Sequence, residues 1–67
     1  MATVVKPNPN VEVYQFRYRK PDPLGDVMTD AIGWVGETPD GTICKADKRW
    51  LQAQGVDISM IPDRFFL

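Results

Sequence analysis

The chain has a single cysteine, Cys44, and no histidine, and this shortage limits how a fold of its size can be held together. One cysteine cannot form an internal disulfide, and without histidine there are too few ligands for a structural zinc site. A hydrophobic core of this size seldom contributes more than about 3–5 kcal/mol, so natural domains of similar length often add a disulfide, a metal or a partner. We therefore expect a protein partner or self-association to supply further stability, and we expect no metal site and no cofactor.

The composition indicates a folded, soluble protein. Hydrophobic residues make up 43% of the 67 residues, which is enough for a globular core. The apolar runs end after about six residues, whereas a membrane-spanning helix needs about twenty. A free thiol without a secretory signal is typical of a reducing compartment. We expect a cytoplasmic protein with no membrane contact.

The stretch VYQFRYRK alternates aromatic and basic side chains within a longer segment, residues 11–20, that is rich in Val, Tyr and Phe. This content favours a β-strand, whose period of two sends alternate side chains to opposite faces. One face then carries three aromatic rings: Tyr14, Phe16 and Tyr18. The other face carries Arg17 and Arg19.

Two interpretations of this strand lead to different functions. A sheet that binds single-stranded nucleic acid needs rings and cations on one surface, and here the alternation separates them. A helix elsewhere in the chain also needs an apolar face on which to pack. We therefore predict that the rings lie in the core and that Arg17 and Arg19, with Lys20 at the edge, form an exposed cationic strip. Base stacking on the rings is the alternative.

Turn signals divide the middle of the chain. The stretch KPDPLGD, residues 20–26, contains two prolines and a glycine, which predict a loop. The stretch ETPDGT places Gly41 where a turn closed by a glycine bulge needs a positive φ. This pattern predicts a hairpin between a strand at 31–37 and a short return strand at 42–45.

The last third begins with a helical composition, KADKRWLQAQG. Gly55 is expected to end the helix, with Val56 opposite Leu51 in a C-terminal cap. Residues 65–67 are too apolar to remain in water, so we expect them to dock on the domain or on a neighbour.

The expected fold class is α+β, with a small antiparallel sheet of three or four strands and one helix packed on one face. All segments belong to one domain, 1–67. They are an extended N-terminal arm at 1–10, a strand at 11–20, a β-hairpin at 30–45, a helix at 46–54 and a C-terminal segment at 56–67.

Charge is divided along the chain, although the formal net charge is only −1. Residues 1–20 hold four basic residues and one acidic residue, whereas residues 21–44 hold five acidic residues and no basic one. Such blocks can steer a charged partner, and an acidic segment can imitate a phosphate backbone. The near-cancellation argues against the strongly basic footprint of a non-specific nucleic-acid binder.

Within the acidic block, three aspartates recur every four residues, which on a helix would align them as a metal or acid–base cluster. Pro23 and Gly25 break such a helix, and the spacing does not match a calcium-binding loop, so we interpret them as loop and turn residues. The candidate binding residues combine the basic strip and this acidic segment: Arg17, Arg19, Lys20, Asp22, Asp26 and Asp30.

No catalytic residue is predicted. The chain lacks histidine, a G-x-S-x-G turn and a phosphate-binding glycine loop, so an enzyme would have to use carboxylates, lysines or Cys44. Lys45 and Lys48 lie close to Cys44 in the sequence, but a strand cysteine in a small domain is typically a small hydrophobic residue. We expect the chain not to be an enzyme.

The sequence therefore favours a non-enzymatic binding module that acts through protein–protein interaction, with a homodimer as one form of partnership. The size and acidity suit an accessory or inhibitor protein of the type that phages and mobile elements encode. The alternative is a nucleic-acid-binding module that uses the aromatic and basic first strand.

Overall fold

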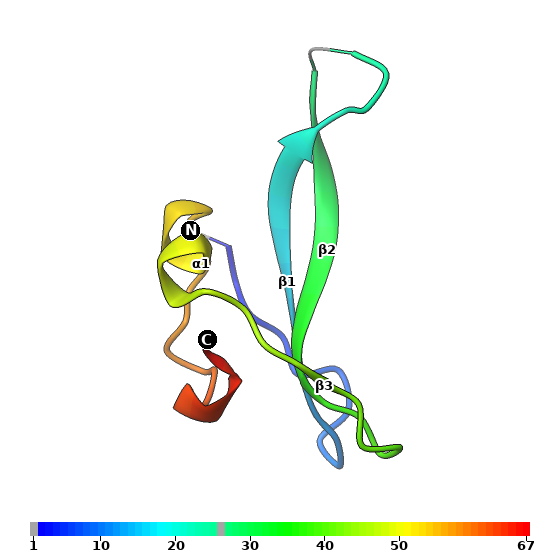
Figure 1. The fold of residues 1–67 in the computed structure, drawn as a ribbon, viewed down its shortest axis with the longest axis vertical. Helices are drawn as coiled ribbons and strands as arrows, with labels where there is room; N and C mark the ends of the chain where they lie inside the picture. The colour runs from blue at the N-terminus through cyan, green and yellow to red at the C-terminus, as the bar shows by residue number, and fades with distance from the viewer. Residues whose placement is uncertain (1, 26) are drawn as a thin grey trace.

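A computed structural model describes residues 2–25 and 27–67 of the chain. The three strands form an antiparallel sheet in the order β1-β2-β3 (Figure 1). The predicted α+β class and three-stranded sheet are confirmed, whereas a fourth strand and a helix packed across one face are not. The elements are β1 (Glu12–Pro21), β2 (Met28–Glu37), β3 (Ile43–Cys44), α1 (Lys48–Ala53) and a 3-10 helix, η1 (Asp63–Phe65).

β1 and β2 form one long hairpin that projects from the rest of the molecule (Figure 1). Their pairing runs from Glu12 opposite Glu37 to Pro21 opposite Met28. The predicted strand at 11–20 ends one residue later than expected, because Pro21 continues β1. Pro21 is tolerated here because odd-numbered residues of β1, such as Gln15, turn their backbone nitrogen away from β2, so the proline removes no hydrogen bond of the ladder.

A tight turn joins β2 to the short strand β3. The Thr38 N–H donates to the Thr42 carbonyl at 2.9 Å, and the Gly41 N–H donates to the Thr38 carbonyl at 3.0 Å. Gly41 has a φ of 89°, the positive value that the ETPDGT pattern predicts. The return strand is brief, with only Gly36 and Glu37 of β2 paired to it.

The helix α1 is shorter than the predicted 46–54. Asp47 caps its start, since the Asp47 carboxylate accepts the Arg49 N–H at 2.8 Å. At its end, the Gly55 N–H donates to the Gln52 carbonyl and the Val56 N–H to the Leu51 carbonyl, each at 3.0 Å. This is the predicted C-terminal cap, with Gly55 at a φ of 78°.

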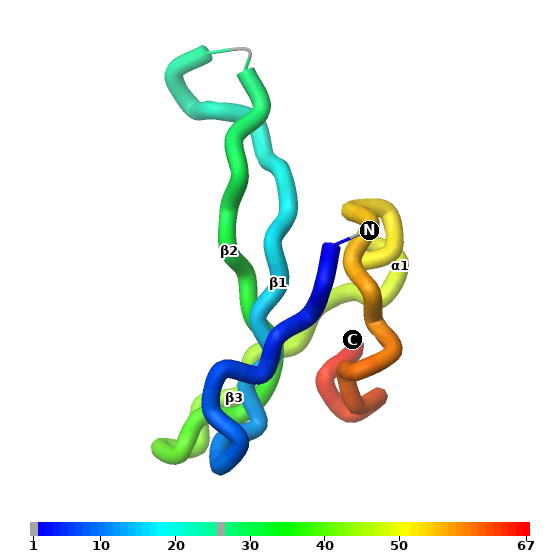
Figure 2. Tube along the Cα trace, turned by 180° about the vertical axis from the view of Figure 1, so that it is seen from behind, coloured from blue at the N-terminus to red at the C-terminus, as the bar shows by residue number. Residues whose placement is uncertain are grey.

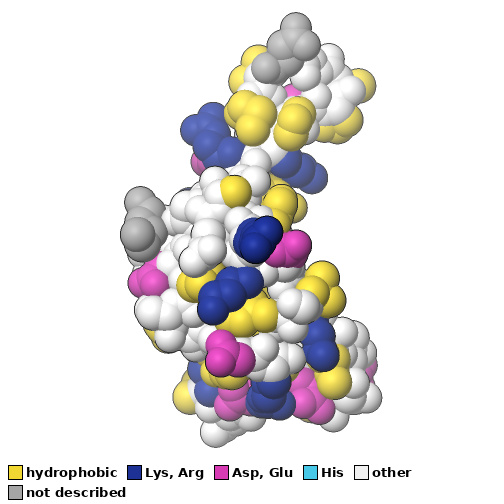
Figure 3. Space-filling model, turned by 60° about the vertical axis from the view of Figure 1, so that its left-hand side comes forward, with side chains coloured by type: hydrophobic (Ala, Val, Ile, Leu, Met, Phe, Trp, Pro, Cys, Tyr) yellow, Lys and Arg dark blue, Asp and Glu magenta, His cyan; other side chains and the backbone are white. Residues whose placement is uncertain are grey.

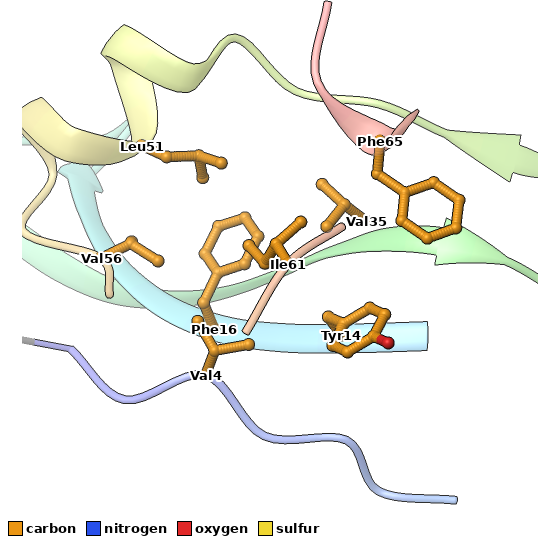
Figure 4. Packing of buried hydrophobic residues seen from close by; sticks show 8 residues of the cluster. All are labelled: Val4, Tyr14, Phe16, Val35, Leu51, Val56, Ile61 and Phe65. Atoms are coloured by element: carbon orange, nitrogen blue, oxygen red, sulfur yellow. The ribbon is translucent and has the colours of Figure 1, made fainter. Parts of the chain in front are cut away.

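The core lies between the end of the hairpin near β3, the N-terminal arm and the segments that follow the hairpin (Figure 4). The prediction of core packing is confirmed for Tyr14 and Phe16, and Tyr18 is half-buried with its ring centroid 5.2 Å from that of Trp50. The C-terminal docking is confirmed for Phe65, whereas Leu67 remains 85% exposed. The buried residues are Val4, Tyr14, Phe16, Val35, Leu51, Val56, Ile61 and Phe65.

The N-terminal arm runs along the outer edge of β1 (Figure 2). Val5 and Gln15 form one antiparallel bridge, with hydrogen bonds of 2.8 Å in both directions. Ala2 then leaves the sheet and pairs with Val56 beyond the helix. The arm thus ties β1 to the C-terminal part of the core, where Val4 is buried.

Candidate functional site

The candidate binding residues that the structure describes lie together on the projecting part of the β1–β2 hairpin. Arg17, Arg19 and Lys20 are on β1, while Asp30 is on β2 directly opposite Arg19. Asp22 begins the connecting loop, and Asp26 lies outside the described residues. The basic and acidic blocks therefore lie side by side, and the separation of charge along the sequence does not produce two separate surfaces.

The register also shows which side chains accompany the arginines. Side chains of directly opposite residues in an antiparallel pair share a face, so Ile32 lies beside Arg17 and Asp30 beside Arg19. Trp34 is opposite Gln15 on the same side. We call this side, which is opposite to the core rings, the outer face: Gln15, Arg17, Arg19, Met28, Asp30, Ile32 and Trp34.

Sequence reasoning missed the apolar part of the outer face. Ile32 is 66% exposed, although it stands in an apolar run that reads as a buried strand. The signal was present, because a period of two applied to β2 sends Ile32 and Trp34 to the same side. The sequence does not show how β2 pairs with β1, and only that register places Ile32 and Trp34 on the same face as the arginines.

The connecting loop forms an apolar tip at the far end of the hairpin. Leu24 is 96% exposed and Val27 is 69% exposed. Figure 3 shows hydrophobic side chains gathered on this projecting end, with Lys and Arg side chains next to them. We call Leu24 and Val27 the hairpin tip.

Asp22 takes part in hydrogen bonds within the described part of the loop. The Asp22 N–H donates to the Val27 carbonyl at 2.9 Å, closing the loop. The Asp22 carboxylate accepts the Leu24 N–H at 2.9 Å, the arrangement of an Asx turn. The prediction that the three aspartates are loop and turn residues is confirmed for Asp22 and wrong for Asp30, which lies in β2 because Arg19 of β1 supplies its partner.

The cationic strip carries exposed charge. Arg17, Arg19 and Lys20 are exposed, and the three ion pairs found within residues 2–25 and 27–67 lie at the other end of the hairpin. The Arg19 guanidinium donates one hydrogen bond, of 3.1 Å, to the Met28 carbonyl. The strip therefore presents positive charge beside the apolar tip.

Exchanging Arg17 and Arg19 together for glutamate is expected to alter binding without unfolding the protein. Both side chains lie opposite to the core rings, so the main cost to stability is the like-charge contact between residue 19 and Asp30, about 0.2–1 kcal/mol. Circular dichroism and urea unfolding measure the fold, with the exposed residues Lys45 and Arg49 exchanged together as the charge-matched control. Loss of folding in the Arg17 and Arg19 variant alone would contradict this assignment of faces.

Polar contacts at the near end of the hairpin centre on Glu12. The Tyr14 hydroxyl donates to one Glu12 oxygen at 2.7 Å, and the Lys6 ammonium lies 3.3 Å from the other. The hydrogen bond from Tyr14 and the one from Lys6 hold the pKa of Glu12 below its ordinary value of 4.5. The same bond to Glu12, with burial, raises the pKa of Tyr14. This cluster joins the arm to β1.

These shifts predict that the free energy of unfolding decreases in acid. A carboxylate whose pKa is lower in the folded state stabilises the fold above its unfolded pKa, and this contribution is lost as the pH falls through the folded value. We expect Glu12→Gln to show a smaller decrease in urea titrations from neutral to acidic pH. Part of the decrease in unfolding free energy will remain in this variant, because hydrogen bonds from Thr38 and Ser59 also lower the pKa values of Asp40 and Asp57. An unchanged decrease in Glu12→Gln would show that Glu12 contributes nothing.

The remaining features suited to chemistry are few. Cys44 is a half-buried free thiol. In the part of the chain that the structure describes, no three Cys, Asp or Glu residues gather as metal ligands, and no helix has the length and hydropathy to cross a membrane. A hollow of about 400 Å³ between the arm and β1 has one ionisable side chain in its lining, that of Arg17.

The fold and the hairpin together define a small α+β protein with a projecting apolar and charged hairpin. Comparison with protein-family models, curated proteins and solved structures finds no match to this chain.

Proposed function

We propose that the chain is a non-enzymatic binding module whose β1–β2 hairpin contacts another protein. The observation that carries this proposal is the hairpin tip, where Leu24 and Val27 expose nearly all or most of their surface on a loop in which Asp22 is hydrogen-bonded to the backbone of both. Exposed apolar groups rimmed by charge are typical of protein–protein contacts. The tip supplies the apolar centre, and Arg19 and Lys20 supply the polar rim.

A protein suits this surface better than a nucleic acid does. The rings of Tyr14 and Phe16 are buried, so they are not available to stack on bases. The tip carries aliphatic side chains, which gain from burial but offer no stacking plane. Arg17 and Arg19 are the features that favour a nucleic acid, and binding through the first strand is therefore the second candidate function.

The size of the chain and its lack of a catalytic group further support an accessory or inhibitor role. An accessory or inhibitor protein of the phage or mobile-element type would act here by covering a surface of a larger protein with the hairpin tip. We propose the cytoplasm as its place of action, because the thiol of Cys44 has no disulfide partner.

Affinity capture with two matched variants tests the protein contact. Leu24→Asp with Val27→Asp changes the tip, and Met60→Asp with Leu67→Asp changes two exposed apolar side chains away from the hairpin. We expect a captured protein to bind the wild type and the control equally, and to bind the tip variant at least about tenfold more weakly, since a central contact contributes about 2 kcal/mol or more. Equal binding by both variants would overturn the proposal.

Titration with nucleic acids tests the second candidate. Single-stranded DNA, RNA and duplex DNA are added at low and at higher salt while the fluorescence of Trp34 and Trp50 is followed. We expect no response. Binding that weakens steeply with salt would favour the nucleic-acid function, because phosphate contacts release counterions.

A further inference from the structure

The hydrogen bonds between the N-terminal arm and β1 show which backbone groups of the hairpin point toward the partner strand and which point away from it. The N–H and C=O of Gln15 both bond to Val5, so they point away from β2. In an antiparallel pair, the backbone groups of successive residues point alternately toward and away from the partner strand. The even-numbered residues of β1 therefore bond to odd-numbered residues of β2, as Phe16 does to Gly33. The even-numbered residues of β2 therefore turn their backbone groups toward the opposite edge, where Gly36 pairs with Cys44 of β3.

Most of this edge of β2 has no neighbour. β3 pairs only with Gly36 and Glu37, and no other segment lies beside the projecting half of β2 in either view (Figures 1 and 2). Within residues 2–25 and 27–67, the outward backbone groups of Asp30, Ile32 and Trp34 have no backbone partner. We call Asp30–Trp34 the open edge.

The two edges of the hairpin differ in how they are protected against another strand. Lysine, other charged side chains and proline are the usual means of protecting an edge, and the projecting part of β1 carries Arg17, Arg19, Lys20 and Pro21. The open edge has one charged residue, Asp30, beside two strong strand formers, Ile32 and Trp34. Only the β2 side is therefore suited to receive an added strand.

We propose that two copies of this chain pair antiparallel along their open edges and form a closed dimer, in which the projecting halves make one continuous sheet in the order β1-β2-β2-β1. Each copy has one open edge, so a two-fold contact uses both and leaves none. The basic, proline-containing β1 strands then stand at both outer sides of the projecting sheet, which prevents further growth. Pairing of a β2 edge with a β1 edge would instead form an open chain of copies, and the cations of β1 oppose it.

A register with Ile32 opposite Ile32 of the second copy satisfies both packing and charge. The two exposed isoleucines then cover each other, and Asp30 lies opposite Trp34 of the second copy. The two Asp30 carboxylates are four residues apart along the strands, about 13 Å, which exceeds the screening length of about 8 Å at physiological salt. The pairing covers residues 29–35 of each copy, because Gly36 and Glu37 are already paired with β3, so Met28 and the hairpin tip of each copy bend away from β3 of the other. No residue of the hairpin tip takes part in this contact.

Sedimentation velocity over a range of micromolar concentrations tests the dimer. We expect the wild type to approach twice the monomer mass of 7.6 kDa as concentration rises. Ile32→Lys places like charges opposite each other and should weaken the dimer by at least about tenfold. Met60→Lys, a change of the same type at an exposed residue outside the sheet, should leave it unchanged. A wild type that stays monomeric throughout, or equal effects of the two variants, would overturn the proposal.

Amide hydrogen exchange by NMR tests the edge itself. We expect the outward amides of Asp30, Ile32 and Trp34 to become protected only at concentrations at which the dimer forms. The amides of Ala31 and Gly33, which bond to β1, should be protected at every concentration. A dimer without this alternating protection would show that another surface joins the copies and would overturn the pairing. Neither experiment depends on the tip, so a failure here is distinct from a failure of the proposed protein contact.

Discussion

Gly36→Ala is expected to leave most of the protein unfolded. Gly36 has a φ of 138°, and a Cβ there would overlap the Glu12 carbonyl oxygen and lie 2.8 Å from the Cα of Val13. These atoms belong to the backbone of the paired strand, so no side chain can move to make room. Strain and overlap together should cost about 3 kcal/mol or more, which is close to the whole stability of about 3–5 kcal/mol expected for so small a core.

Urea unfolding followed by tryptophan fluorescence measures this loss, and Gly41→Ala is the matched control. Gly41 also has a positive φ, but no atom lies within 4 Å of an added Cβ, so only the conformational cost of about 1–2 kcal/mol applies. We expect Gly41→Ala to unfold at a lower urea concentration but still cooperatively. Equal midpoints for the two variants would show that β1 and β2 do not approach as closely at Gly36 as the structure has them.

The features that the sequence predicted correctly depend on neighbouring residues. Alternation along one strand was enough to place Tyr14 and Phe16 in the core, because a strand's faces follow from its period alone. The turn glycine Gly41 and the cap at Gly55 were predictable for the same reason, since each depends on a local backbone conformation.

The features that it missed depend on residues far apart in the sequence. Nothing near Gly36 indicates that the Glu12 carbonyl will occupy the place of its side chain, because that contact needs the register of two strands. The arm was predicted as extended, but its bridge to Gln15 joins segments whose pairing no local pattern specifies. Pro21 was predicted to lie beyond the strand because proline is a local breaker, and the strand continues through it because β2 supplies a partner.

The candidate site shows the same limit. Composition identified the basic strip and the acidic block. Because the two lie in different parts of the sequence, they were predicted as two different contact surfaces. The hairpin places Asp30 opposite Arg19 and brings the apolar Ile32 beside Arg17, so the surface is mixed in charge and partly apolar. Such a surface favours a protein partner more than either charged block does by itself.

Phe65→Ala is the second substitution expected to remove most of the stability. Phe65 is 1% exposed, and its ring centroid lies 6.2 Å from that of Tyr14, so it joins the C-terminal segment to β1. Its backbone carbonyl also accepts the Ala46 N–H at 3.1 Å. Truncating a buried phenylalanine costs about 3–5 kcal/mol, because the lost burial adds to the cavity left behind. Urea unfolding should therefore show little folded protein in Phe65→Ala.

Leu67→Ala is the matched control, since the side chain of Leu67 is almost fully exposed and its removal should change the free energy of unfolding by about 0.5 kcal/mol or less. Comparing Phe65→Ala with the tip variant also separates loss of stability from loss of the partner contact. A two-stranded hairpin alone is at best marginally stable in water, so Phe65→Ala should lose partner binding together with its circular dichroism signal. The tip variant at Leu24 and Val27 should lose binding and keep that signal. A folded Phe65→Ala with the wild-type midpoint would show that the C-terminal segment is not part of what holds the hairpin in place.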